Sequence, residues 1–276
     1  MTRFVAYTLI ITALCVGCKS EFEKIRLSNN PEKILEASTK YYEDEEYLRA
    51  QTLFEIILNQ YRGTKEAEEL FFYYAYTHYH LRQYQLASHY FKNFGNTFAY
   101  SQYREEADYM SAYSSYRLSP GFRLDQKPTN EAIEGFQEFV NRYPQSERVS
   151  EANRLIDEMR EKLEEKSLSQ GRLYLDLEQY EAAITAFENT LEEFPETDQA
   201  AEIRFSIFKA SYLYAVNSIF ERREERYEKS VKRYESFKSK HADSAFAKQA
   251  DSLMADIQKQ LKSLKNDRYQ NKSSGD

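Results

Sequence analysis

Four histidines and many carboxylates are the side chains that could support catalysis or bind a metal ion. His78 and His80 lie two residues apart, so on a helix they point to different faces and cannot chelate one ion together. The acidic residues occur in runs such as Glu43–Glu46 and Glu221–Glu225, which are typical of solvated helix surfaces. Gly 7 in 276 residues leaves no glycine-rich phosphate loop. The sequence therefore predicts a protein that is not an enzyme and has neither a metal nor a cofactor.

Two cysteines, Cys15 and Cys18, have the spacing of a redox or metal-binding pair, but they end an apolar leader that offers such a pair no folded surroundings. Arg3 precedes the apolar run Phe4–Gly17, which is shorter than the ~20 residues of a transmembrane helix and has the length of a signal-peptide core. The leader therefore predicts an exported protein.

The end of this leader, Val16-Gly17-Cys18, resembles a bacterial lipoprotein signal, in which the chain is cut before a cysteine that carries lipid. Cys15 departs from that motif, which usually has leucine at this position. We expect residues 1–17 to be a signal peptide and Cys18 to be lipidated. The residue after Cys18 is Lys19 and not aspartate. By the same resemblance, this implies sorting to the outer membrane. An ordinary cleaved signal or an anchor helix remains the alternative.

Composition indicates a helical protein. Gly 7 and Pro 5 are too few for an all-β, collagenous or disordered chain, and charged residues make up 30% of it. The net charge of −7 disfavours a nucleic-acid partner. Tyr 24 and Phe 18 without any Trp indicate many half-buried ring surfaces whose hydroxyl groups stay solvated.

From Pro31 onward the chain repeats a small residue followed four positions later by an aromatic one. The pairs are Ala50/Phe54, Ala87/Phe91, Ala132/Phe136, Ala183/Phe187 and Ser230/Tyr234. A spacing of four places both residues on one helical face, where the small residue admits a neighbouring helix. Ten residues after each aromatic residue stands a hydroxyl group, on Thr64, Ser101, Ser146, Thr197 and Ser244. We expect each of these to cap the next helix.

These signals predict eleven helices in consecutive pairs. Their expected ranges are 31–42, 46–61, 64–81, 84–94, 101–117, 129–143, 146–176, 179–194, 197–220, 223–240 and 244–264. A loop before residue 128 separates the fifth from the sixth.

The pattern resembles the tetratricopeptide repeat. The landmarks of that family fall in the fourth copy on Gly171, Tyr174, Ala183, Phe187 and Pro195, although every copy is longer than the ~34-residue period. The second copy departs from the family at His78 and Ala99. The resemblance implies an all-α fold, an α-α superhelix (solenoid) of about five helix pairs with a C-terminal capping helix.

In this repeat family the first helix of each pair lines a concave face. Mapping the repeats predicts a peptide-binding groove formed by Tyr42, Phe72, Tyr76, Tyr79, Tyr109, Tyr113 and Tyr116. The neighbouring Phe71, Tyr74 and Ala75 would face the core. A tyrosine-rich groove suits an extended or aromatic-ended peptide, because tyrosine supplies contact area at low entropy cost. The alternative is that these rings only pack between helices.

Three local segments carry a second resemblance, and the last of them is more specific than the repeats. They are the first helix with Ile34-Leu35-Glu36-Ala37 and Tyr41-Tyr42, the turns Tyr143-Pro144-Gln145-Ser146 and Phe194-Pro195-Glu196-Thr197, and the connection Leu124-Asp125-Gln126 to Thr129, Ala132 and Phe136. They resemble the BamD family, lipoproteins of the machinery that assembles outer-membrane β-barrels.

This second resemblance implies a non-enzymatic scaffold, lipid-anchored on the periplasmic face of the outer membrane. Its N-terminal repeats would receive unfolded outer-membrane proteins. Its C-terminal repeats would dock on the barrel protein BamA through a surface within residues 130–240. The expected organisation is a lipidated tether (18–30), a groove half (31–128), a docking half (129–265) and a polar tail (266–276). The alternatives are a lipoprotein that coordinates envelope or peptidoglycan machinery, and a lipoprotein that captures a small nutrient in a closed pocket.

Overall fold

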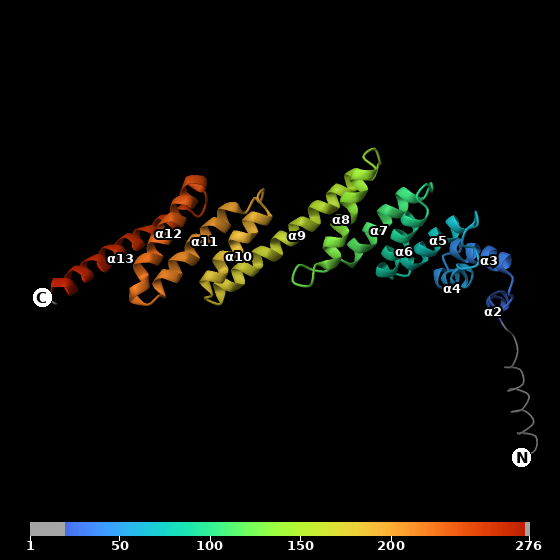
Figure 1. Cartoon of the computed structure of the whole chain (residues 1–276), viewed down its shortest axis with the longest axis horizontal. Coiled ribbons are helices and arrows are strands. Elements are labelled where there is room, and N and C mark those ends of the chain that lie inside the picture. Colours follow the sequence, from blue (N-terminus) through green and yellow to red (C-terminus); the bar gives the residue numbers. More distant parts are fainter. Residues whose placement is uncertain (1–19, 274–276) are drawn as a thin grey trace, which may run out of the picture. The chain divides into compact units, whose positions relative to one another are not determined.

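The computed structural model describes residues 20–273, with side chains described as far as residue 266. Cys18 and the predicted signal peptide lie outside these residues. All regular structure in the described part is helical (Figure 1). The twelve helices are α2 (Glu21–Arg26), α3 (Pro31–Glu43), α4 (Tyr47–Ile57), α5 (Ala67–His80), α6 (Tyr84–Thr97), α7 (Arg104–Leu118), α8 (Lys127–Arg142), α9 (Val149–Asp176), α10 (Tyr180–Glu193), α11 (Ala200–Val216), α12 (Phe220–His241) and α13 (Ala247–Ser273).

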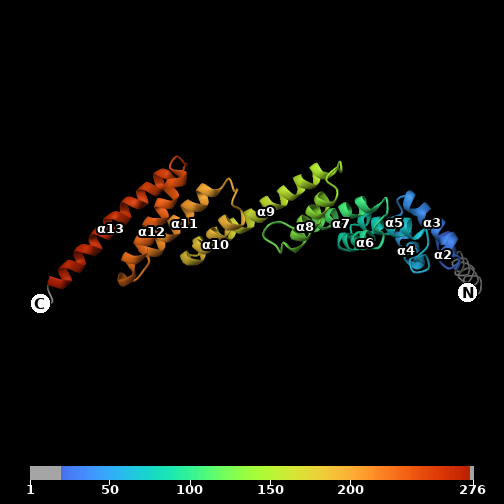
Figure 2. The same cartoon turned by 45° about the horizontal axis from the view of Figure 1, so that its top comes forward.

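The predicted all-α class and the eleven predicted helices are confirmed, with ends displaced by a few residues. The chain forms two compact units: unit 1 runs to Met159 and unit 2 starts at Arg160, so the boundary falls within α9. In each unit successive helices pack as antiparallel neighbours (Figures 1 and 2). None of the helices from α2 to α13 combines the length and apolar character that crossing a bilayer needs.

The helical array extends further at both ends than the sequence predicts. The segment expected to be a tether contains α2, and Phe22 and Ile25 of this helix pack against the first core of unit 1. Ser20 caps α2, because its Oγ accepts a hydrogen bond from the Glu23 N–H at 3.3 Å. At the other end, α13 continues past Leu264 to Ser273.

Three helix pairs share one tight turn. The residues Glu45, Arg82 and Glu178 have φ angles of 60°, 59° and 59°, in the left-handed region. The residue after each of them donates its N–H to the carbonyl five positions earlier, as Gln83 does to His78 O at 2.9 Å. These are Schellman motifs, in which glycine is the usual residue at the left-handed position. The chain makes the turn with ordinary side chains instead.

We expect Arg82→Gly to raise the free energy of unfolding by about 0.5 kcal/mol, because the relief of left-handed strain exceeds the added entropy of glycine in the unfolded chain. Arg82→Ala is the control, since it removes the charge and keeps the Cβ atom. Urea denaturation followed by circular dichroism measures both variants. Equal midpoints for the alanine and glycine variants would mean that the turn is not strained.

The regularly spaced hydroxyl residues after each helix pair have a different role from the one expected. The helices begin three residues later than predicted, at Ala67, Arg104, Val149, Ala200 and Ala247, so the hydroxyl residues are not N-caps. Instead, Ser101 Oγ accepts the Tyr103 N–H at 2.9 Å, and Thr197 Oγ1 accepts the Gln199 N–H at 3.0 Å. Each hydroxyl group therefore closes a short turn before the helix.

The same two hydroxyl groups also tie this turn to the first helix of the preceding pair. Ser101 Oγ donates to Glu68 on α5, and Thr197 Oγ1 donates to Glu164 on α9. In these two copies the hydroxyl group thus joins one helix pair to the next.

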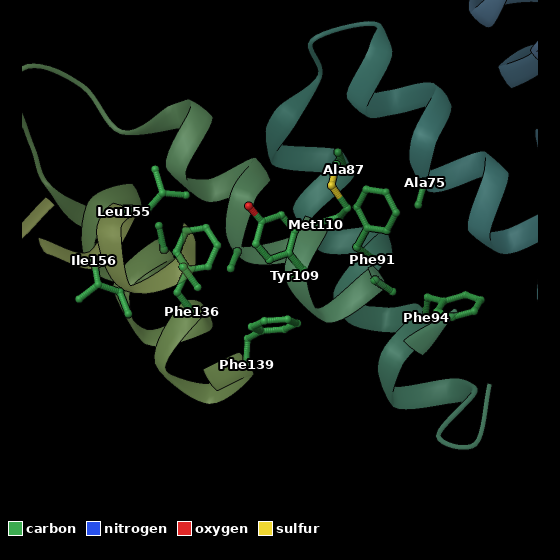
Figure 3. Packing of buried hydrophobic residues seen from close by; sticks show 14 of the residues in the cluster. Ala75, Ala87, Phe91, Phe94, Tyr109, Met110, Phe136, Phe139, Leu155 and Ile156 are labelled. Atoms are coloured by element: carbon green, nitrogen blue, oxygen red, sulfur yellow. The ribbon is translucent and has the colours of Figure 1, made fainter. Parts of the chain in front are cut away.

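The cores lie where the small and aromatic positions of the repeat meet. In unit 1, Ala50, Ala87 and Ala132 are fully buried beside the rings of the same copies. Figure 3 shows how side chains from α5 to α9 interlock in the larger cluster of this unit, which includes Ala75, Ala87, Phe91, Phe94, Tyr109, Met110, Phe136, Phe139, Leu155 and Ile156. Unit 2 repeats the arrangement with Ala183 and Phe187, and closes on α13 through Ile257 and Leu264.

The connection between α7 and α8 is held by the side chain of Gln126. Its Nε2 donates to the carbonyl oxygens of Gly121 and Leu124 at 2.9 and 3.0 Å, and its Oε1 accepts from Thr129 Oγ1 at 2.7 Å. Gln126 is only 5% exposed. The segment that carries the more specific family resemblance is therefore an ordered loop. The buried amide of Gln126 supplies hydrogen bonds to backbone carbonyl groups that the turn itself does not satisfy.

Candidate functional site

A continuous row of rings crosses α3, α4, α5 and α7 in unit 1. We call it the tyrosine face, and it consists of Tyr42, Tyr47, Tyr76, Tyr79, His80, Tyr113 and Tyr116. His80 stacks on Tyr47 with ring centres 4.1 Å apart and lies 5.9 Å from Tyr76. The row continues from Tyr76 to Tyr79 at 6.4 Å, to Tyr113 at 6.2 Å and to Tyr116 at 5.6 Å. Five of the seven residues expected in the groove are therefore members of one surface.

The other two expected groove residues lie beneath it. Phe72 and Tyr109 are only 6% and 5% exposed. Phe72 stacks on Tyr103 at 4.5 Å and meets the edge of Tyr76 at 5.0 Å, so it supports the face from the core. Helix α5 is aromatic on most of its sides because it packs between neighbouring pairs, and periodicity alone therefore cannot separate its core rings from its surface rings.

Among the residues expected to face the core, Tyr74 and Ala75 are buried as predicted, at 3% and 0% exposure. Phe71 is half-buried and packs against Phe98 at 5.9 Å. Sequence reasoning did not assign Tyr47 and His80 to the face. The signal for Tyr47 was its recurrence three residues before the small position, as in Tyr84, whereas nothing in the sequence distinguishes His80 from the other histidines.

Polar side chains fix the orientation of these rings. Tyr76 donates its hydroxyl hydrogen to Glu106 Oε1, and Arg148 pairs with the other oxygen of the same carboxylate. The guanidinium of Arg148 lies 4.4 Å from the ring centre of Tyr109. Tyr116 donates to Glu158 Oε1 at 2.9 Å. The hydroxyl groups of Tyr76 and Tyr116 are thereby held by helices further along the chain.

The tyrosine face carries little charge of its own. Burial raises the pKa values of Tyr42 and Tyr76, so both phenols stay protonated at neutral pH. Burial lowers the pKa of His80, which favours the neutral ring. Arg117 is one cation beside the row: its guanidinium lies 4.7 Å from the ring centre of Tyr84 and donates to Tyr79 Oη at 3.4 Å. A neutral aromatic surface with a cation at one side can bind apolar and aromatic side chains.

His78 has structural surroundings. His78 is 4% exposed and hydrogen-bonds through Nδ1 to Gln83 Oε1 at 2.6 Å. Burial also lowers the pKa of His78. Within residues 20–266, no group of three or more histidine, cysteine, aspartate or glutamate side chains is arranged to hold a metal ion.

Antiparallel helix pairs that repeat a small residue against a ring define this chain as a tetratricopeptide-like helical repeat protein. A family model described as YfiO, outer membrane lipoprotein, matches residues 28–217, and the chain belongs to this family. Membership associates the chain with the outer membrane and confirms the second resemblance predicted from the sequence.

Two curated relatives carry the name outer membrane protein assembly factor BamD. The protein of Rickettsia prowazekii (strain Madrid E) is 22% identical over 210 residues, which cover 76% of this chain and 84% of the relative. The protein of Caulobacter vibrioides (strain ATCC 19089 / CIP 103742 / CB 15) is 29% identical over 111 residues, covering 40% of this chain and 36% of the relative.

Similarity to solved structures is weaker. The TPR2AB domain of yeast Sti1, in a complex with pHSP90, has a TM-score of 0.40 and 11% identity, with 83% of this chain and 98% of that chain covered. The MamA protein has a TM-score of 0.32 and 14% identity, with 79% and 98% covered.

Proposed function

We propose that this chain is a non-catalytic assembly factor for outer-membrane proteins, held at the periplasmic face of the outer membrane by lipid on Cys18. Its tyrosine face receives extended or aromatic-ended segments of unfolded substrates. Family membership and the assembly-factor names of two relatives support the general role. The tyrosine face is the observation that carries the substrate-binding part, because half-buried rings offer contact area that is already ordered.

Tyr76→Ala together with Tyr79→Ala is expected to weaken binding of a peptide with a C-terminal phenylalanine by about tenfold or more, since each buried aromatic contact contributes more than 1 kcal/mol. Fluorescence anisotropy with a labelled peptide measures the change. Tyr100→Ala is the matched control, because Tyr100 is 104% exposed and lies outside the row. Unchanged affinity of the double variant, with helicity retained, would contradict the proposal.

The second part of the proposal, docking on a barrel protein, concerns unit 2. Four large apolar side chains near two neighbouring turns stay exposed: Leu173 at 55%, Leu177 at 57%, Ile219 at 67% and Phe220 at 47%. Asn217 Nδ2 donates to Tyr180 Oη at 3.2 Å and so links the two turns. Clustered apolar side chains on a soluble surface favour a protein contact. We assign this surface, within residues 130–240, to a BamA-type barrel protein.

Purification from detergent-solubilised outer membranes with a C-terminal tag is the test of this assignment. We expect a BamA-type barrel protein to co-purify with the wild-type chain and to be lost with Leu177→Ser and Phe220→Ser. Leu86→Ser is the control, because Leu86 is 45% exposed and belongs to unit 1. Recovery of peptidoglycan enzymes without a barrel protein would instead favour the envelope-scaffold alternative.

A further inference from the structure

Helix α2 follows directly after the cysteine that we expect to carry lipid. Cys18 precedes Glu21, the first residue of α2, by three positions, so their Cα atoms are at most about 11 Å apart. The headgroup layer of a bilayer is about 5–7 Å thick on each side. A chain anchored through Cys18 therefore has only Lys19 and Ser20 between its lipid and its first helix, which belongs to unit 1 (Figure 1).

Helix α2 is fixed to the body of unit 1. The ring of Phe22 meets the ring of Tyr41 edge-on, with centres 5.8 Å apart. The guanidinium of Arg49 on α4 lies 5.8 Å from the ring centre of Phe22 and 5.5 Å from that of Tyr41. Ile25 packs against the same core. Because side chains of α3 and α4 hold α2, this helix cannot serve as a flexible spacer.

The connection from α2 to α3 is ordered as well. Ser28 Oγ accepts the Asn30 N–H at 3.4 Å, and Asn30 Oδ1 accepts the Lys33 N–H at 3.0 Å, which caps α3. The chain is thus held from the Ser20 cap into α3. A lipid on Cys18 therefore determines which side of unit 1 meets the bilayer.

The outward side of α2 combines a cation with an apolar side chain. Phe22 and Ile25 face the core, and the helical period places Lys24 and Leu27 on the opposite side. Both of these residues are exposed, Leu27 at 50%. A lysine beside a leucine suits the bilayer interface, where the ammonium group reaches phosphates while the apolar side chain enters the acyl boundary.

The charges of α2 do not oppose such a contact. Glu23 pairs with Arg26 at 2.7 Å, and the opposite charges of Glu21 and Lys24 also cancel. The helix is therefore neutral, although the chain as a whole carries a net charge of −7. A neutral surface can approach anionic headgroups without repulsion.

We propose that α2 lies on the phospholipid headgroups, with Lys24 at the phosphate groups and Leu27 in the interface, and holds this end of unit 1 against the bilayer. This inference rests on the lipid that the proposed function places on Cys18. One leucine binds a bilayer too weakly to hold a protein there by itself, so the short link to the lipid is what keeps α2 in contact.

The contact brings the tyrosine face close to the membrane. Tyr41, which packs on Phe22, is followed by Tyr42, the first residue of that face. A substrate segment bound there is held about one helix diameter, roughly 10–12 Å, from the helix that lies on the headgroups. Unit 1 would therefore present its substrate at the bilayer surface.

The chain has no tryptophan, so Leu27→Trp introduces a single reporter. The lipidated full chain is reconstituted in vesicles of phosphatidylethanolamine with a minor share of phosphatidylglycerol, with and without bromine on the acyl chains. We expect the brominated lipid to lower the emission of this variant about twofold, because the side chain lies at the acyl boundary. Leu124→Trp is the matched control. Leu124 is 63% exposed in the loop before α8 of the same unit, and its variant should keep its emission.

A second variant tests the short link. A flexible insert of about ten glycine and serine residues between Lys19 and Ser20 keeps the lipid but frees α2 from it. In this background we expect the emission of Leu27→Trp to approach that of the control.

Three results would overturn the proposal. Leu27→Trp that is lipidated and bound to vesicles but not quenched would show that α2 does not touch the bilayer, while the anchor of the proposed function would stand. Undiminished quenching with the insert would show that the short link does not seat α2. An unmodified mass at Cys18, with the chain free of vesicles, would contradict the proposed anchor and this inference with it.

Discussion

Gly171→Leu is expected to lower the free energy of unfolding of unit 2 by about 3 kcal/mol or more, because the core has no room for a side chain at this position. A Cβ atom on Gly171 would lie 2.5 Å from both Cδ1 and Cε1 of Phe187. Phe187 is fully buried and cannot move aside without displacing α10. Urea denaturation followed by circular dichroism measures the loss.

Two comparisons separate this clash from a general effect of leucine. Gly121→Leu is the control, since a Cβ atom there meets no other atom within 4 Å. We expect it to change stability by less than about 0.5 kcal/mol. Adding Phe187→Ala to Gly171→Leu should restore part of the loss, since the two side chains compete for one volume. Full stability of Gly171→Leu alone would show that α9 and α10 are not in this close contact.

Phe136→Ala is expected to lower the free energy of unfolding of unit 1 by about 3–5 kcal/mol, the usual cost of a large cavity in a packed core. Phe136 is fully buried, and its ring centre lies 5.5 Å from that of Tyr109 (Figure 3). The near-ultraviolet circular dichroism of the tyrosines reports the loss of packing in the same experiment.

The control for this cavity is Leu124→Ala, a truncation of an apolar side chain that is 63% exposed in the loop before α8. It should alter stability by less than about 0.5 kcal/mol. If Phe136→Ala were as mild as this control, the cluster around α7 and α8 would not be the stabilising core of unit 1.

The helices were predictable because the small and aromatic positions of the repeat are the residues that pack one helix against another. Ala87 with Phe91 and Ala183 with Phe187 mark a close helix contact and the ring that fills the space beside it, and both pairs are fully buried. Periodicity measures which residues share a face, so it located every helix from α3 to α13.

What the sequence missed depends on contacts between distant segments. Helix α2 is short, and its burial depends on α3, so local signals did not reveal it. The accessible part of the tyrosine face depends on which sides of α5 its neighbours cover, which removed Phe72 from the surface. The hydrogen bonds from Ser101 to Glu68 and from Thr197 to Glu164 join residues over 30 positions apart, so an N-cap was the simpler expectation.

The turns at Glu45, Arg82 and Glu178 also bear on the order in which the chain acquires structure. Each closes through hydrogen bonds that span six residues, and each helix packs chiefly on the next one along the chain. Such a chain has low contact order, which favours rapid folding that starts from any pair and spreads to its neighbours. A chain delivered one end first can therefore complete its leading pairs before its last residues arrive.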